Sequence, residues 1–352
     1  MNILITGGAG YLGSVLIPKL LIRGHKLRVL DLGYFGVGHL RFMRQPIEVI
    51  REDIRAIISD KQFCESLLSG VDCIIHLAAI SNDPSAELYP ELTTEVNVEA
   101  TKVLAEKARE KGIRFIFSSS CSVYGEHEGD ADEDSGLQPL TVYAVSKLES
   151  EKLLESLKTK SWSPVILRNG TLFGYSPRMR FDLVLNIFSL YSSLYNEIKI
   201  FGEGYEWRPF LHVADCAQAM VFFAEKKQVQ FSCYNVSHQN LRVIDLADIF
   251  KKVRPDLDVQ HIKMANQDLR NYRVSTERIE SEGFKTRISL DLGVEDMMES
   301  IENGVIQDPE AIYYRNVKWL KELTQIGGKT HKDMMAFIES MATMNMRNRQ
   351  AF

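Results

Sequence analysis

Short apolar runs alternate with longer amphipathic segments along the chain, and this alternation limits the folds that are open to it. Apolar runs of a few residues predict strands, and apolar residues at helical spacing between them predict helices. Successive strands joined by helices are typical of a parallel sheet, because a parallel connection needs a long crossover. The sequence therefore predicts an α/β fold, a doubly wound parallel sheet of the Rossmann type. The expected strands are 2–5, 27–30, 73–77, 114–117, 164–167 and 232–236, and the expected helices are 12–22, 63–68, 94–111, 143–157, 181–195, 213–225 and 243–253.

The regular alternation loosens after Phe173, where glycine-containing breakers appear at 174–177 and 201–204. We therefore expect two domains that are not continuous in sequence. The first predicted domain takes residues 1–173 and about 210–237, and a smaller C-terminal domain takes about 174–209 and 238–326. Residues 327–352 carry no interpretable motif and are expected to form a tail.

Charge and cysteine content exclude several classes of protein. The formal net charge of the 352 residues is −5, which gives no reason to expect a nucleic acid as partner. Five cysteines are scattered without a CxxC pair, so the sequence predicts neither a metal site nor a disulfide framework. No run approaches the roughly 18 apolar residues of a membrane span. A cytoplasmic protein with reduced thiols, and no membrane partner, is expected.

A glycine-rich turn follows the first expected strand and opens the first expected helix. Gly7, Gly10 and Gly13 stand there at a dinucleotide-binding spacing. The first glycine permits a tight turn, the second lets backbone N–H groups approach a pyrophosphate, and the third lets helix and strand pack closely. The plain alternative is a turn that only connects a strand to a helix.

An acidic residue ends the second expected strand. Asp31 comes about 20 residues after the glycine turn, where a carboxylate accepts hydrogen bonds from the adenosine ribose hydroxyls of NAD. The same charge repels the 2′-phosphate of NADP. Arg28 and Arg41 lie nearby and leave NADP as an alternative. The sequence favours NAD.

Two further segments indicate an enzyme. Tyr143 and Lys147 lie four residues apart and so share one face of an expected helix. A neighbouring ammonium group lowers the pKa of a tyrosine by stabilising its phenolate, which makes it a better proton acceptor. Ser120, at the end of an expected strand, is placed to bridge a substrate oxygen to Tyr143. An exposed, solvated Tyr–Lys pair is the alternative where these companions are missing.

Together with Asp53–Ile54, residues 76–79 and Asn97, these motifs resemble the extended short-chain dehydrogenases, the NAD-dependent nucleotide-sugar epimerase/dehydratase family, and most of all its UDP-glucose 4-epimerase-like branch. The resemblance implies NAD as cofactor, a nucleotide-diphosphate sugar as substrate, and a homodimer formed through the helices at 94–111 and 143–157. It implies a structural role for His76. The catalytic residues it implies are Ser120, Tyr143 and Lys147, and the cofactor-binding residues are Gly7, Gly10, Tyr11, Leu12, Gly13, Asp31, Asp53, Ile54, Leu77, Ala78, Ala79, Asn97, Tyr143 and Lys147.

The substrate residues follow from the same resemblance. Residues 203–215 resemble the family segment whose arginine meets the nucleotide diphosphate, and Arg208 holds that position. A second phosphate arginine is expected at Arg270, with Arg273 as the alternative. The segment 178–182, which carries Arg178 and Arg180, either supplies charge to the nucleotide or caps a helix. The full expected set is Ser122, Thr171, Arg178, Arg208 and Arg270.

The residues that follow Ser120 bear on the reaction. In dehydratases and decarboxylases of the family a carboxylate commonly stands where this chain has Cys121–Ser122. Elimination needs an acid and a base, whereas 4-epimerisation needs only the hydroxyl, the tyrosine and the lysine. We therefore expect an epimerase acting at C4. Alternatives are a dehydrogenase or reductase that releases a keto-sugar, a 4,6-dehydratase, and an NAD-binding regulatory module. Cys121 as an acid/base and Glu126 or His127 as intruding groups are also open, against a packed thiol and loop-exposed side chains.

Overall fold

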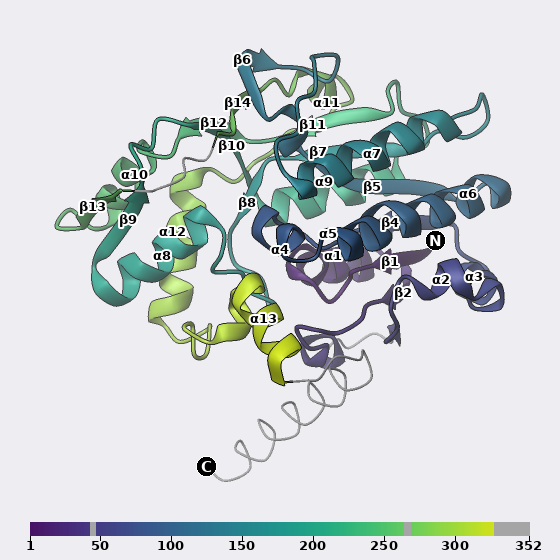
Figure 1. Cartoon of the computed structure of the whole chain (residues 1–352), viewed down its shortest axis with the longest axis horizontal. Helices are drawn as coiled ribbons and strands as arrows, with labels where there is room; N and C mark the ends of the chain where they lie inside the picture. The colour runs from purple at the N-terminus through teal and green to yellow at the C-terminus, as the bar shows by residue number, and fades with distance from the viewer. Residues whose placement is uncertain (43–46, 264–268, 327–352) are drawn as a thin grey trace, which may run out of the picture.

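A parallel sheet of seven strands runs through the centre of the molecule (Figure 1). The computed structural model describes residues 1–42, 47–263 and 269–326; the predicted tail at 327–352 and the side chain of Arg41 lie outside the described part. The sheet places the first strand in the middle and winds outward to both sides, which is the Rossmann arrangement. The predicted fold class is therefore confirmed. In spatial order the strands are β11 (Cys233–Val236), β7 (Val165–Asn169), β5 (Arg114–Ser120), β4 (Cys73–His76), β1 (Asn2–Thr6), β2 (Lys26–Leu30) and β3 (Glu48–Ile50).

Alternate residues of the strands face two separate apolar layers. On one face, Ile3 and Ile5 pack under α1 (Tyr11–Ile22) and α9 (Val213–Glu225). On the other face, Leu4 packs against four helices. The inner strands β4 and β7 are buried along their whole length on both faces, as continuous apolar runs in a parallel sheet predict, whereas the edge strand β3 is largely exposed. The helices of the second face are α2 (Ala56–Ser59), α3 (Lys61–Leu68), α6 (Ala100–Lys111) and α7 (Val142–Leu157).

Some element boundaries differ from those expected. The edge strand β3 has only three residues and was not expected, because so short a run carries no alternation. The helix expected at 94–111 is divided into α5 (Pro90–Thr94), a π-helical turn η2 (Glu95–Glu99) and α6. The helices expected from 181 and 243 begin later, at Val184 and Leu246, after non-helical segments. Other short elements are η1 (Gly38–Phe42), α4 (Asp83–Leu88) and η3 (Cys121–Tyr124).

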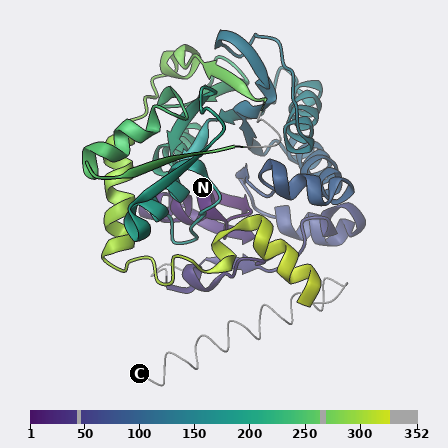
Figure 2. The same ribbon diagram turned by 60° about the vertical axis from the view of Figure 1, so that its left-hand side comes forward.

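A second apolar cluster lies beyond the carboxyl end of the sheet, and Figure 2 shows its helices and small sheets grouped on one side of the molecule. Phe173 and Phe210 contribute to it from two strands of a separate three-stranded sheet. The division into two domains at the expected residues stays a prediction. The elements of this region are β8 (Thr171–Phe173), α8 (Val184–Tyr195), β9 (Glu197–Phe201), β10 (Trp207–His212), β12 (Gln239–Arg242), α10 (Leu246–Val253), β13 (Asp258–Ile262) and α12 (Leu290–Glu302).

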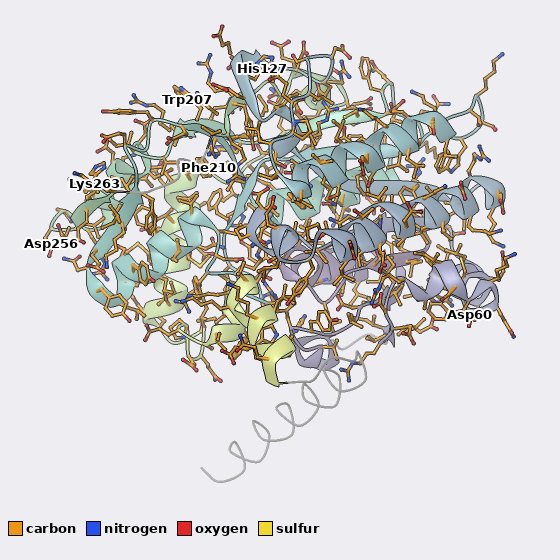
Figure 3. The ribbon with its side chains drawn as sticks, in the orientation of Figure 1. Asp60, His127, Trp207, Phe210, Asp256 and Lys263 are labelled. Atoms are coloured by element: carbon orange, nitrogen blue, oxygen red, sulfur yellow. The ribbon has the colours of Figure 1, made fainter. Side chains whose placement is uncertain are left out.

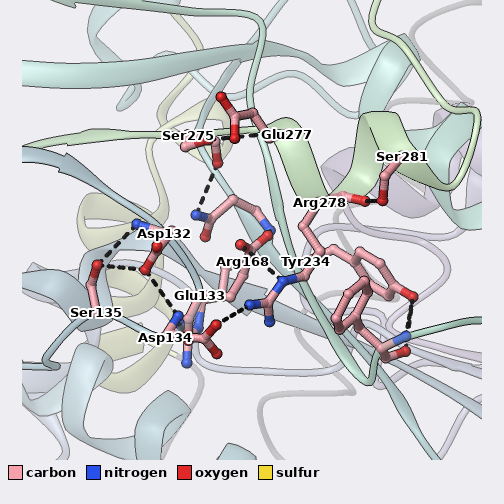
Figure 4. A network of polar contacts seen from close by, with 12 residues as sticks. Asp132, Glu133, Asp134, Ser135, Arg168, Tyr234, Ser275, Glu277, Arg278 and Ser281 are labelled. Carbon is pink, nitrogen blue, oxygen red and sulfur yellow. Dashed lines mark hydrogen bonds and ion pairs between the residues drawn. The ribbon is translucent and has the colours of Figure 1, made fainter.

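A parallel strand pair outside the main sheet joins β6 (Glu126–Ala131) to β14 (Asn271–Val274). Polar contacts hold the loop after β6 in place, as Figure 4 shows: Arg278 of α11 (Glu277–Ser281) reaches Glu133 and Asp134. The chain continues through η4 (Ile312–Tyr314) to a last helix, α13 (Asn316–Ile326). Among the described residues, no helix is both long and apolar enough to cross a membrane.

The glycine turn after β1 is fixed by backbone contacts that leave no room for a side chain. Gly7 has a φ of 70°, and a Cβ there would lie 2.7 Å from the backbone nitrogen of Ala78. A Cβ on Gly13 would lie 2.4 Å from the carbonyl oxygen of Gly8. Gly10 is less crowded, with one backbone oxygen at 3.2 Å. Gly7 and Gly13 therefore fix the turn and the packing of α1, and Gly10 keeps the space before the helix N-terminus open.

We expect Gly13→Ala to lower the free energy of unfolding by roughly 1–3 kcal/mol, because the added methyl group must displace backbone rather than a flexible side chain. Urea unfolding followed by circular dichroism measures the change. Gly136→Ala is the matched control, since a Cβ at that position meets nothing within 4 Å. Equal stabilities of the two variants would contradict the packing role assigned to Gly13.

Candidate active site

The carboxyl ends of the central strands open into one cavity of about 370 Å³. Its wall includes the glycine turn after β1, the ends of β2, β4, β5 and β7, and the first turn of α7. This is the edge where ligands bind in open α/β sheets. Most of the predicted site residues line it. Those on the wall are Gly7, Gly10, Tyr11, Leu12, Gly13, Asp31, Asp53, Ile54, Leu77, Ala78, Ala79, Ser120, Ser122, Tyr143, Lys147, Thr171, Arg178 and Arg270.

The glycine turn and Asp31 form one end of the cavity. Asp31 accepts hydrogen bonds from the backbone N–H groups of Ala9 (2.9 Å) and Gly33 (2.8 Å), one at each carboxylate oxygen. Burial raises the pKa of Asp31, and these N–H groups oppose that rise. Each oxygen keeps a further lone pair for a ribose hydroxyl. A turn with space at Gly10, a helix N-terminus behind it and a fixed carboxylate beside it suit a dinucleotide.

The next part of the wall is held by an ion-pair chain. Asp53 accepts from the guanidinium group of Arg55 at 2.7 Å, and Arg55 also reaches Glu95 at 2.7 Å. These contacts fix the turn that carries Ile54, whose side chain is buried at the cavity. The predicted adenine contacts, Asp53 and Ile54, are therefore side by side at the same end as Asp31.

Ser120, Tyr143 and Lys147 meet at the other end. The Nζ of Lys147 donates to the backbone oxygen of Ser118 at 2.8 Å and lies 5.8 Å from the ring centroid of Tyr143. The hydroxyl of Ser122 donates to the Oγ of Ser120 at 2.9 Å. Thr141 caps α7 by accepting from the N–H of Ala144, which fixes the first turn on which Tyr143 sits. The structure thus brings the three expected catalytic side chains to one wall.

Burial is the main influence on the pKa values of Tyr143 and Lys147. Burial raises the pKa of Tyr143 to about 12, with Asp83 adding to the rise while Arg180 and a hydrogen bond from Ser120 oppose it. Burial lowers the pKa of Lys147 to about 7, and Glu151 opposes that change. The sequence argument expected Lys147 to lower the pKa of Tyr143. In the structure, burial is the largest influence on the pKa of each group, and the groups that oppose the rise for Tyr143 are Arg180 and Ser120.

A buried ion pair supports the strand behind the catalytic side chains. Arg168 of β7 binds Glu151 of α7 at 2.8 Å, and both side chains are almost fully buried. Glu151 also accepts from the hydroxyl of Ser119 at the end of β5. Asn169 donates to the hydroxyl of Ser118 and to the backbone oxygen of Ser119. The carboxyl end of β5 is therefore fixed from two sides, which fixes the position of Ser120.

Asp83 is a cavity residue that the sequence reasoning missed. It follows β4 and accepts from the hydroxyl of Thr141 and from the guanidinium group of Arg270. Arg180, from the segment for which the sequence left two roles open, lines the same cavity and pairs with Asp182 at 2.9 Å. Ligands of open α/β sheets bind at the carboxyl ends of the strands, so the polar residues after β4 could have been considered from the sequence.

Two predicted residues lie behind the wall and do not line the cavity. Asn97 is buried, and its amide binds the backbone of Ile80 and the hydroxyl of Ser146. Arg208 donates to the backbone oxygens of Trp207 and Arg270 and lies over the ring of Tyr272. As placed, Asn97 supports Ile80 and Arg208 supports Arg270. Their direct contacts with cofactor and substrate stay predictions.

The remaining candidates are placed away from the chemistry. Cys121 is fully buried, its thiol donates to the backbone oxygen of Arg168, and burial raises its pKa well above the ordinary value. His76 has both ring nitrogens bonded to the hydroxyls of Thr6 and Thr101. His127 lies at the outer edge of the molecule in Figure 3, on β6. Arg273 pairs with Asp130 of the same outer strand pair.

Comparisons with known proteins agree with this geometry. The sequence profile of the NAD dependent epimerase/dehydratase family matches residues 3–237. The chain belongs to this family. The resemblance stated from the motifs is thereby confirmed, as is NAD as cofactor, since the family is NAD-dependent. A member of the epimerase/dehydratase family is an enzyme, and the coarse function, that of an NAD-dependent nucleotide-sugar epimerase/dehydratase, is supported.

Individual relatives differ in the reaction that their names state. A protein of Bacillus subtilis (strain 168) described as an uncharacterized UDP-glucose epimerase is 34% identical over 236 residues, which cover 62% of this chain and 71% of that protein. UDP-glucuronic acid decarboxylase 1 of Arabidopsis thaliana is 26% identical over 88% of this chain and 72% of its own length. The solved structure of UDP-glucuronic acid 4-epimerase from Bacillus cereus in complex with NAD matches with a TM-score of 0.73 and 26% identity, over 86% of this chain and all of that one.

The lowered pKa of Lys147 predicts a pH-dependent effect on the stability of this family member. Between about pH 7 and pH 10.5 the folded state holds fewer protons on Lys147 than the unfolded state does. Stability therefore rises with pH in that window, by at most about 1.4 kcal/mol per pH unit. Lys147→Met removes this rise, whereas Lys152→Met, on an exposed position of the same helix, retains it. Urea unfolding at pH 7, 8 and 9 without added NAD measures it, and parallel pH profiles for wild type and Lys147→Met would contradict it.

Proposed function

We propose that this enzyme is a cytoplasmic nucleotide-sugar epimerase that inverts C4 of a UDP-hexose. The carboxylates at the cavity support this choice over dehydration. Of the carboxylates on the described part of the wall, Asp31, Glu52 and Asp53 stand with the predicted cofactor contacts, and Asp83 stands near Tyr143. Both oxygens of Asp83 already accept hydrogen bonds, from Thr141 and Arg270. The ion pair with Arg270 and the hydroxyl of Thr141 hold the Asp83 carboxylate in place, so the proposal gives it a positioning role and assigns no described wall carboxylate to the removal of a ring proton.

In this proposal Tyr143 removes the proton from the C4 hydroxyl and later returns it to the opposite configuration. The glycine turn and Asp31 would hold NAD, which would supply the acceptor for the C4 hydride and the donor for its return. Ser120 holds the substrate oxygen against the phenol, through the hydrogen bond that it makes with Tyr143. Lys147 holds the backbone of Ser118, and in its protonated form it stabilises the negative oxygen that develops on the tyrosine. Arg270, on the same wall, is the cation for the diphosphate of the nucleotide.

The main test is incubation of the purified enzyme with UDP-glucose. We expect UDP-galactose to form without net production of NADH, because the hydride returns to the same sugar. Net NADH would instead indicate a dehydrogenase that releases a keto-sugar, and an unsaturated or decarboxylated product would indicate elimination or decarboxylation. Chromatography of the nucleotide sugars with NADH absorbance separates these outcomes.

Removal of one phenol oxygen tests the acid/base role directly. Tyr143→Phe is expected to lower kcat by roughly 10²- to 10⁴-fold, the usual contribution of a general acid/base, with little change in KM. Tyr205→Phe, at an exposed tyrosine outside the cavity, is expected to keep the wild-type rate. An active Tyr143→Phe enzyme would assign the proton transfer to another group.

A homodimer through α6 and α7 is part of the proposal. The two helices pack side by side on one face of the sheet, and Val145 of α7 is 39% exposed in the single chain. We expect light scattering to give the mass of two chains, and Val145→Glu to give one, because burying an unpaired carboxylate in an interface is costly. Ile22→Glu, an exposed apolar position on α1, is the control. A monomeric wild type would refute this arrangement.

A further inference from the structure

The last helix of the described chain reaches the cofactor end of the cavity. Asn316, the first residue of α13, lines the cavity itself. Trp319 and Leu323 of the same helix are buried in an apolar cluster with Tyr34 and Phe35, which follow the end of β2. The indole N–H of Trp319 donates to the backbone oxygen of Tyr34 at 2.6 Å. Figure 1 shows α13 between this loop and α4, and α13 contacts α4.

Arg178 connects this helix to the glycine turn. Its Nη2 donates to the side-chain oxygen of Asn316 at 2.5 Å, and its guanidinium group lies 3.7 Å from the ring centroid of Phe35. The segment before it is bound to the start of α1, because Ser176 donates to the backbone oxygen of Tyr11 at 2.7 Å. Phe181, just beyond, donates its backbone N–H to the oxygen of Tyr314. The arginine is thus held between α13 and the N-terminal turn of α1.

The charge of Arg178 is incompletely matched by these partners. The side chain is 5% exposed, and both of its hydrogen-bond acceptors, Asn316 and the backbone oxygen of Met179, are uncharged. Its Nε is buried without a hydrogen-bond partner. Burial lowers the pKa of Arg178 to about 9, and the neighbouring Arg180 adds to that change. A buried guanidinium group in this condition is costly unless an anion completes it.

The anion that suits this position is the diphosphate of the cofactor. Arg178 lines the same cavity as Gly10 and lies close enough to Asp31 for their charges to interact. The helix N-terminus at Gly10 and the planar fork of an arginine both favour phosphate oxygens. We propose that Arg178 binds the diphosphate of NAD, and that Asn316 of α13 is the positioning residue that holds it there. The sequence reasoning assigned Arg178 to the substrate or to a helix cap.

Trp319 has the matching role on the opposite side of the arginine. By holding the backbone of Tyr34 it fixes the loop that carries Phe35, and the Phe35 ring supports the guanidinium plane. The C-terminal helix is therefore part of the cofactor site. This inference concerns cofactor binding alone, so it holds whichever sugar carbon reacts, and a failed epimerase assay leaves it untouched.

The test compares ligands that share the adenosine but differ in the diphosphate. The purified full-length protein, with bound nucleotide removed, is titrated with NAD, ADP-ribose and adenosine, the last in competition with NAD. Arg178→Met is expected to weaken NAD and ADP-ribose by roughly 10- to 100-fold and to leave adenosine unchanged. Asn316→Ala is expected to weaken the same two ligands by about tenfold, because the guanidinium group loses an acceptor that holds it.

The controls are chosen on the same stretch of chain. Arg315→Met removes a neighbouring arginine whose side chain donates to the backbone oxygen of Glu310. Asn303→Ala removes an exposed asparagine at the end of α12. Both are expected to bind all three ligands as the wild type does. Arg178→Lys, which keeps the charge without the fork, is expected to restore part of the NAD affinity.

Three results would overturn the proposal. Equal loss of NAD, ADP-ribose and adenosine in Arg178→Met would show that the residue only supports the fold. No loss of any ligand in Arg178→Met would show that it does not touch the cofactor. A loss confined to NADP, titrated in parallel, would place the guanidinium group at a 2′-phosphate. Adenosine binding equal to that of the wild type and an unchanged circular dichroism spectrum would show that a variant is correctly folded.

Discussion

The close approach of the glycine turn to the end of β4 determines where the cavity lies. Gly7 runs against the backbone of Ala78, and Gly13 against that of Gly8, so helix α1 begins as near to the sheet as atoms allow. Any side chain at these two positions would push the turn into the space at the carboxyl edge. The wall residues of the neighbouring strands, from Asp31 to Ser120, take their positions relative to this fixed turn.

Close packing at one end of the cavity is accompanied by electrostatic cost at the other. Lys147 and Tyr143 are both buried, and each has its pKa shifted toward the neutral form. Neighbouring contacts stabilise the fold against the free-energy cost of burying these two groups. They are the cap of α7, the buried Arg168–Glu151 ion pair, and the hydrogen bond of Asn169 to Ser118. Tyr143 and Lys147 can therefore remain neutral in the folded protein. A ligand that brings a complementary charge to them would stabilise the folded state.

The central sheet and most of the wall could be predicted from the sequence, because their signals are local. Apolar runs separated by helical spacing give the strands, and the spacing of Gly7, Gly10, Gly13 and Asp31 gives the cofactor end. Asn97 and Arg208 were also assigned from motif position, but the structure places both behind the wall, since a motif fixes sequence neighbours and does not fix which face a side chain takes. Asp83 could be suspected only from its place after β4, and Asn316 could not be assigned from a pattern, because its partner Arg178 lies 138 positions away.

The contact between Tyr34 and Trp319 joins residues 285 positions apart, and the contact between Arg178 and Asn316 spans 138. All seven strands of the central sheet precede α13 in the chain. On a ribosome the sheet, the glycine turn and the catalytic wall are therefore synthesised before α13, the helix at the cofactor end of the cavity. A nascent chain can assemble its catalytic residues first, and it closes the cofactor end of the cavity only after α13 has been synthesised.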